Sequence, residues 1–414
     1  MNENPSPEPL AALSMTAHGF HRLAASRWRA RQPRARLICA HGLTRNRHDF
    51  DPLARGLHDS VEVVTFDFSG RGDSDRLAAP TDYGFSQYEL DAMSVLSVCE
   101  QAHADDLALA RRLVAGPGRD GVAQVRSRRA PPRLSWWQRL LGVRLPITEV
   151  NFDDTMPGQR ATATAGAAVR GGGAGWPGEV AGRHGDDLSR VEAAARLPLV
   201  WLGTSMGGLV GLMLAARANS PIDALVLNDV GPMVPWGGIA RLSSYVGRHT
   251  RFDSQDDVEA HLRDVCRDFG PLTDEQWAAL AATSAEDDGK GGRALRYDPA
   301  IARGLALGGG LIGRTGLRWW EGVDLWHLWE QVRCPVLVLR GAESDILPET
   351  VAREMQRRRP GTRMVEFPGV GHAPALVDAM QIAAVRGFVL EQGAVPAASD
   401  DSAPPAWGLA RAGI

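Results

Sequence analysis

Residues 199–216 read LVWLGTSMGGLVGLMLAA and contain the pentapeptide Gly203-Thr204-Ser205-Met206-Gly207. An apolar run precedes the pentapeptide and a stretch of small and apolar residues follows it, so we expect a strand, a sharp turn and a helix in that order. A G-x-S-x-G motif in this context is typical of a nucleophile elbow, whose serine has a strained backbone that only small neighbours tolerate. The pattern predicts that Ser205 is a nucleophile, and that Gly203 and Gly207 let strand and helix pack closely.

A second motif lies upstream, where an apolar strand over residues 36–40 runs into the loop His41-Gly42-Leu43. A tetrahedral acyl intermediate carries negative charge on the former carbonyl oxygen, and preorganised backbone N–H groups stabilise that charge. We expect the N–H groups of Leu43 and Met206 to form this oxyanion hole, with Gly42 permitting the close approach. His41 comes before the nucleophile, whereas a triad with such an elbow runs Ser, Asp, His along the chain. We therefore expect His41 to have a packing and hydrogen-bonding role.

The residues that could complete a triad with Ser205, an acid and a histidine base, lie downstream of it in the sequence. An unbroken apolar run over residues 335–341 predicts a buried parallel strand, and Asp345 follows it. Residues 363–367 predict a final strand that leads through glycines to His372, whose two ring nitrogens could reach the serine hydroxyl and a carboxylate. The predicted triad is therefore Ser205, Asp345 and His372. Asp229 also ends a strand, over residues 224–229, and is the competing acid; we assign it the structural role of holding the next turn.

With these motifs the chain resembles the α/β-hydrolase superfamily over most of residues 15–115 and 196–393. The motifs that carry the resemblance are His41-Gly42, the turn 67–74, Gly203 to Gly208, Asn228 to Pro232, Gly341 to Asp345, and Gly371-His372. The resemblance implies an α/β fold with a mostly parallel eight-stranded sheet, helices on both faces and a helical cap.

The sequence around the nucleophile is similar to the branch that contains carboxylesterases, enol-lactonases and carbon–carbon bond hydrolases of ring-cleavage products. The carbon–carbon hydrolases usually place Asn before the nucleophile, where this chain has Thr204. This difference favours ester or lactone cleavage over carbon–carbon bond cleavage.

These patterns divide the chain into one core with two insertions and two ends. The segments are a core of residues 15–231 and 319–393, a helical cap of residues 232–318, a Gly/Ala/Arg-rich insertion of residues 116–195 that we expect to be largely mobile, and flexible termini of residues 1–14 and 394–414.

Within the predicted cap, residues 254–266 and 273–282 have helical patterns. The second of these opens with Thr273 and Gln276 at the spacing of a capping box. Four aromatic residues of the cap are candidates to bind the substrate, with packing inside the cap as the alternative for each: Trp236, Tyr245, Phe252 and Trp277.

Composition excludes several other classes of protein. The chain has 414 residues, 44% of them hydrophobic, and a formal net charge of -3, which gives no sign of nucleic-acid binding. We expect no membrane span and no export, and hence a cytoplasmic location, because there is no long apolar run or leader-like segment. The four cysteines and eleven histidines lack metal-binding or disulfide spacing, so we expect no metal and no cofactor. The sequence does not indicate an oligomeric state.

The predicted function is hydrolysis of small, largely apolar carboxylic esters or lactones through an acyl-enzyme on Ser205. Three alternatives stay open at this point. They are a carbon–carbon bond hydrolase with the same triad, an acyltransferase in which an alcohol or thiol intercepts the acyl-enzyme, and a hydrolase-like protein that binds a ligand without turnover.

Overall fold

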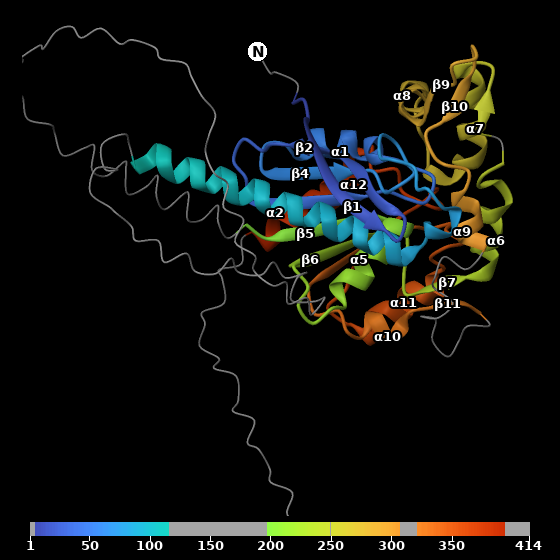
Figure 1. The fold of residues 1–414 in the computed structure, drawn as a ribbon. Coiled ribbons are helices and arrows are strands. Elements are labelled where there is room, and N and C mark those ends of the chain that lie inside the picture. The colour runs from blue at the N-terminus through green and yellow to red at the C-terminus, as the bar shows by residue number, and fades with distance from the viewer. Residues whose placement is uncertain (1–4, 116–196, 249, 307–320, 394–414) are drawn as a thin grey trace, which may run out of the picture. The chain divides into compact units, whose positions relative to one another are not determined.

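The computed structural model describes residues 5–115, 197–248, 250–306 and 321–393 (Figure 1). The chain divides into two units, one of residues 1–103 with 196–414 and one of residues 104–195. Of the second unit only residues 104–115, the end of one helix, are described. The predicted insertion of residues 116–195 and the predicted flexible end of residues 394–414 therefore lie outside the described residues.

The first unit contains an eight-stranded sheet in the order β1-β2-β4-β3-β5-β6-β12-β13. Strand β2 pairs antiparallel with β1 and β4, and every other neighbouring pair is parallel. This confirms the predicted mostly parallel sheet of an α/β fold. The strands are β1 (Glu8–Thr16), β2 (Gly19–Trp28), β3 (Ala35–Ala40), β4 (Val61–Phe66), β5 (Leu199–Thr204), β6 (Ala224–Asn228), β12 (Val336–Gly341) and β13 (Arg363–Phe367).

Helices cover both faces of this sheet. On one face, α1 (Asp51–Leu57) and α12 (Ala379–Gln392) pack on a core that includes Leu37 and Val200. Side chains alternate along a strand, so Trp201 points to the opposite face. There it donates its indole N–H to the Gly207 carbonyl of α5 (Met206–Ala215), 3.1 Å away. Other helices of this unit are α10 (Trp326–Trp329), α11 (Glu349–Arg358), the short 3-10 helices η1 (Arg47–Phe50) and η2 (Pro80–Asp82), and residues 85–103 of α2 (Phe85–Ala115). No helix in the described ranges is long and apolar enough to span a membrane.

The N-terminal boundary of the core lies earlier than predicted. Residues 8–14 belong to β1, which pairs with β2 along its whole length from Glu8 opposite Arg27 to Thr16 opposite Gly19. Ala12 and Ser14 are the buried residues of this strand. The expectation of a flexible end over residues 1–14 is therefore wrong for residues 8–14. The buried residues of β1 are small, so the sequence lacks the alternation of large apolar and polar residues that predicts a strand.

The described residues of 233–306, which lie between β6 and β11 (Gly322–Asp324) and which we call the inserted segment, are mixed rather than all helical. The helical patterns over 254–266 and 273–282 form α7 (Gln255–Val265) and α8 (Asp274–Ser284), and the capping box at the start of α8 is present. A three-stranded sheet, β8-β10-β9, accompanies these helices, which corrects the purely helical description. The strands of this small sheet are β8 (Arg251–Phe252), β9 (Ala285–Asp287) and β10 (Arg293–Leu295). The inserted segment also contains β7 (Met233–Pro235), α6 (Trp236–Tyr245), η3 (Arg267–Phe269) and α9 (Ile301–Ala306).

Candidate active site

Ser205 lies in the turn between β5 and α5, at the carboxyl end of a central parallel strand. Its backbone has φ 51° and ψ -116°, a conformation that is strained for a residue with a side chain. The flanking glycines are required by close packing. A methyl group on Gly203 would lie 2.2 Å from the Gly207 carbonyl oxygen, and one on Gly207 would lie 2.2 Å from that of Ala40. The local geometry is therefore that of the predicted nucleophile elbow.

His372 joins the serine to a carboxylate. It lies in the loop after β13, is buried, and places Nε2 2.8 Å from Ser205 Oγ and Nδ1 2.8 Å from Asp229 Oδ2. A carboxylate can only accept hydrogen bonds, so Nδ1 carries the proton and Nε2 is free to accept one from the hydroxyl. The arrangement can deprotonate Ser205 and stabilise the resulting imidazolium.

The carboxylate beside His372 is Asp229, so the prediction that Asp345 fills this position is wrong. Asp229 follows β6, is fully buried, and also accepts hydrogen bonds from the Gly341 N–H at 2.8 Å and from Ser344 Oγ at 2.6 Å. The Asp345 side chain is 42% exposed, and the Arg241 guanidinium binds both its oxygens at 2.6 and 2.8 Å. Hydrogen bonding to Arg241 lowers the pKa of Asp345.

A signal for Asp229 was present in the sequence. It ends the apolar run that follows the nucleophile segment, and β6 lies beside β5 in the sheet. Adjacent parallel strands place their carboxyl ends at the same edge. Asp345 is separated from its strand, β12, by a turn whose Ser344 instead binds Asp229.

The two predicted oxyanion-hole residues both lie next to Ser205. Gly42 lies beside the nucleophile, and a methyl group on it would make an ordinary van der Waals contact with Ser205 Cβ at 3.7 Å, so packing does not require glycine there; Leu43 follows it. Met206 is the first residue of α5, where a backbone N–H has no acceptor within the helix. The oxyanion-hole role of Leu43 and Met206 stays a prediction.

His41 has the packing role that we expected. Its ring is buried, Nδ1 lies 2.7 Å from the Gly42 carbonyl oxygen, and the Phe68 N–H donates to Nε2 at 3.1 Å. Since Nε2 accepts, the proton is on Nδ1 and the ring is neutral. Burial lowers the pKa of His41 to about 3, and nearby arginine charges contribute to this shift.

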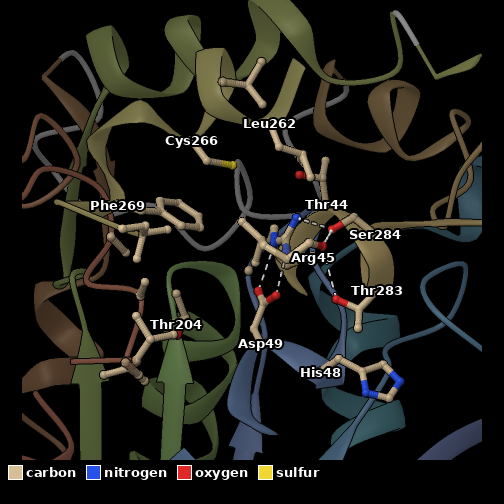
Figure 2. Close-up of a pocket in the computed structure, with 18 of the residues that line it drawn as sticks. Thr44, Arg45, His48, Asp49, Thr204, Leu262, Cys266, Phe269, Thr283 and Ser284 are labelled. Atoms are coloured by element: carbon tan, nitrogen blue, oxygen red, sulfur yellow. Dashed lines mark hydrogen bonds and ion pairs between the residues drawn. The ribbon is translucent and has the colours of Figure 1, made fainter. Parts of the chain in front are cut away.

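A cavity of about 390 Å³ opens at Ser205 and His372 between the sheet and the inserted segment. Figure 2 shows Leu262, Cys266 and Phe269 on the side of the inserted segment. Arg45 lines the cavity and links the loop after β3 to the inserted segment. Its guanidinium binds Asp49 at 2.6 and 2.9 Å and donates to Ser284 Oγ of α8 at 2.9 Å (Figure 2). Much of the lining is apolar and contributed by the inserted segment: Leu242, Val246, Leu262, Val265, Phe269, Leu272, Leu280 and Leu295.

Of the four aromatic residues predicted to bind the substrate, Tyr245 lines this cavity and the other three do not. Trp236 is 41% exposed at the start of α6. Phe252 packs against the His261 ring with centroids 5.0 Å apart. Trp277 is buried beneath the Arg263 guanidinium. The prediction is therefore corrected for Trp236, Phe252 and Trp277: the first is turned to solvent, and the other two pack within the inserted segment.

Comparison with known proteins agrees with this architecture. A family model described as the alpha/beta hydrolase fold matches residues 35–379. A 3-hydroxybutyrate-oligomer hydrolase from Cupriavidus necator is 29% identical over 374 residues, which cover 89% of this chain and 93% of that protein. A pimeloyl-[acyl-carrier protein] methyl ester esterase from Vibrio parahaemolyticus is 27% identical over 214 residues, covering 50% of this chain and 77% of the relative. Among solved structures, an alpha/beta hydrolase from Novosphingobium aromaticivorans is similar with a TM-score of 0.61 and 26% identity, over 94% of this chain and 99% of that one.

Proposed function

Because the chain belongs to the α/β-hydrolase family, we propose that it is a serine hydrolase of small, largely apolar carboxylic esters or lactones. The observation that carries this proposal is the position of the His372 ring, within 2.8 Å of both Ser205 Oγ and Asp229 Oδ2. The esterase and oligomer hydrolase among its relatives support ester hydrolysis in general.

In the proposed mechanism, Ser205 Oγ attacks the acyl carbon while His372 Nε2 takes its proton. The negative charge that forms on the carbonyl oxygen is stabilised by the N–H groups of Leu43 and Met206. His372 then gives the proton to the departing alcohol, which leaves an acyl-enzyme. A water molecule then attacks the acyl carbon while the same nitrogen takes its proton, and that proton passes to Ser205 Oγ as the bond to the acyl group breaks and the acid is released. Asp229 stabilises the imidazolium in both halves.

The cavity supports a small substrate. Its volume of about 390 Å³ lies near the lower end of the range of about 300–1,000 Å³ that is typical of ligand sites. We propose that the inserted segment acts as a cap, since it supplies most of the apolar lining. The relative from Cupriavidus necator is a hydrolase of 3-hydroxybutyrate oligomers by name, and a short hydroxy-acid oligomer is itself a small carboxylic ester. We therefore include such oligoesters among the proposed substrates.

The test is labelling with a fluorophosphonate followed by peptide mapping. We expect one label per chain on Ser205, no label in Ser205→Ala, and a strongly slowed reaction in His372→Ala, where the hydroxyl has lost its base. Ser284 lines the same cavity and hydrogen-bonds Arg45. Ser284→Ala is therefore the matched control and should keep the label on Ser205. A label on another serine would remove the mechanism.

The substrate is tested by kcat/KM on p-nitrophenyl esters of graded chain length, a lactone, a 3-hydroxybutyrate dimer and a ring-cleavage dienoate. We expect turnover of short esters to exceed that of the dienoate. The opposite order would favour the carbon–carbon bond hydrolase instead.

A further inference from the structure

Arg71 is a buried cation that touches both residues of the proposed oxyanion hole. It follows β4, in a turn of residues 70–73, and is 1% exposed. Its Nε donates to the Leu43 carbonyl oxygen at 2.9 Å, and one terminal nitrogen donates to that of Ser69 at 2.8 Å. The other terminal nitrogen donates to Tyr88 Oη at 2.9 Å and lies 3.6 Å from Met206 Sδ.

We propose that Arg71 is a positioning residue that fixes Leu43 and Met206, so that their N–H groups point at the same oxygen of the transition state. This role rests on the proposed ester hydrolysis. The two residues come from separate elements, the loop after β3 and the start of α5, and one planar guanidinium contacts both of them. An oxyanion hole is effective when its donors are held in place before charge develops, because no reorganisation is then needed during the reaction.

The turn that carries Arg71 is itself held in place by the inserted segment. The Gly72 N–H donates to the Arg296 carbonyl oxygen at 2.8 Å, and the Asp298 N–H donates to that of Gly70 at 2.8 Å. Arg71 and Tyr297 form a β-bridge between these two bonds, and Tyr297 lines the cavity. The side chain also lies over the Tyr88 ring, with the guanidinium carbon 4.5 Å from the ring centroid. Both ends of Arg71 are therefore fixed, as a positioning role requires.

Within the described ranges the Arg71 guanidinium contacts no carboxylate, and its hydrogen-bond acceptors are neutral. Burying an unpaired cation costs free energy, which an apolar residue in the same turn would avoid. At this position the positive potential favours the negative oxygen of the transition state. The same charge contributes to lowering the pKa of the neighbouring His41. Lysine would keep the charge but lose the fixed fork that reaches Leu43 and Met206 together.

The test compares Arg71→Lys with Tyr88→Phe, which removes one acceptor of the terminal nitrogen that also lies near Met206 but leaves in place the ring under the guanidinium and the bonds to the Leu43 and Ser69 carbonyl oxygens. Losing one oxyanion donor costs about 10²–10³ in kcat elsewhere, so we expect a misplaced pair to lower kcat by about 10- to 100-fold, with KM within about threefold. Tyr88→Phe should change kcat by less than about threefold.

A second readout separates positioning from general loss of structure. A trifluoromethyl ketone forms an adduct with Ser205 that carries the oxyanion, whereas the corresponding secondary alcohol binds the cavity without forming it. In Arg71→Lys the ketone should lose affinity by the same factor as kcat/KM, and the alcohol should bind as in the wild type. If Arg71→Lys does not fold, Met206→Leu keeps the backbone N–H but removes the sulfur contact, and should lower kcat by about threefold or more.

The outcomes separate the two proposals. Absence of ester turnover and of Ser205 labelling in the wild type would overturn the proposed function, and with it the role of Arg71. Normal wild-type turnover with an unchanged kcat in Arg71→Lys would overturn the role of Arg71 alone. The role of Arg71 would also be overturned if kcat fell as far in Tyr88→Phe as in Arg71→Lys, or if Arg71→Lys lost as much affinity for the alcohol as for the ketone. Where Arg71→Lys does not fold, an unchanged kcat in Met206→Leu would overturn it.

Discussion

Replacing Asp229 by asparagine is predicted to inactivate the site by moving a proton to the wrong nitrogen of His372. Asp229 Oδ1 accepts the Gly341 N–H, while Oδ2 accepts from both Ser344 Oγ and His372 Nδ1. An asparagine has only one oxygen. If that oxygen stays on the Gly341 N–H, the new amide N–H₂ faces His372 Nδ1, which must then accept. The imidazole proton moves to Nε2, which can no longer accept from Ser205.

The flipped amide does not avoid this loss. It would return an oxygen to His372 but point an N–H₂ group at the Gly341 N–H, leaving a buried donor without an acceptor at a cost of about 1–3 kcal/mol. The charge that stabilises the imidazolium is lost in either orientation. We therefore expect kcat of Asp229→Asn to fall by about 10⁴, which is about 5 kcal/mol of activation free energy.

Asp345→Asn is the matched control, because it makes the same chemical change in the carboxylate that the sequence predicts as the acid of the triad. Its side chain is partly exposed and binds Arg241, so we expect kcat to change by less than about threefold. The assay is steady-state ester hydrolysis at neutral pH, with circular dichroism as a check on folding. A larger loss in folded Asp345→Asn than in Asp229→Asn would refute the reasoning and return the acid to Asp345.

Three further predictions concern the site and the neighbouring loop. Ser205→Ala and His372→Ala should each lower kcat by about 10⁶ and the double variant by little more, since members of one catalytic unit are not additive; additive losses measured under single-turnover conditions would contradict this. The pKa of His41 is about 3 when folded and 6.5 in the unfolded chain, so between these values the unfolded state binds a proton that the folded state does not. Its contribution should lower the free energy of unfolding by about 1.4 kcal/mol per pH unit as pH falls from about 6 to 4, relative to His41→Gln, in urea titrations; parallel pH profiles of the two proteins would contradict it. Tyr245→Ala should raise KM by about tenfold because it removes part of the cavity wall, whereas Trp236→Ala should leave KM within about twofold; equal changes in the two would contradict this placement.

The sequence predicted the sheet and the elbow at Ser205 because both depend on local patterns. Buried parallel strands are continuous apolar runs, and each run that was identified forms a strand of the sheet. The elbow requires glycine at two positions, since a side chain at either would overlap a backbone atom. His372 was identifiable because it follows the last strand of the sheet. Information of this kind is contained in a few adjacent residues.

The choice of acid and the cavity lining depend on contacts between distant segments, which local patterns do not contain. Asp229 and Asp345 both follow apolar strands, and what separates them is that Ser344 and the Gly341 N–H bind the first while Arg241 binds the second. Each of these contacts joins residues more than one hundred positions apart. For the same reason the sequence could not tell that Tyr245 lines the cavity and that three other aromatic residues do not.

One residue of β6 links the three members of the proposed triad. The Asn228 carbonyl oxygen accepts the Ser205 N–H at 3.0 Å, and its side chain donates to Thr204 Oγ1 at 3.0 Å and to the Pro374 carbonyl oxygen at 2.9 Å. Asp229 follows it directly, and Pro374 lies two residues after His372. The nucleophile, the acid and the histidine loop are therefore held together by two adjacent strands of the sheet, without any contact from the inserted segment in this set of bonds. It follows that sequence changes in the inserted segment should act on substrate choice through the cavity lining. They should act on the chemistry where they reach the turn that carries Arg71, or Asp268, whose carbonyl oxygen accepts the N–H of Gly371 beside His372 at 2.7 Å.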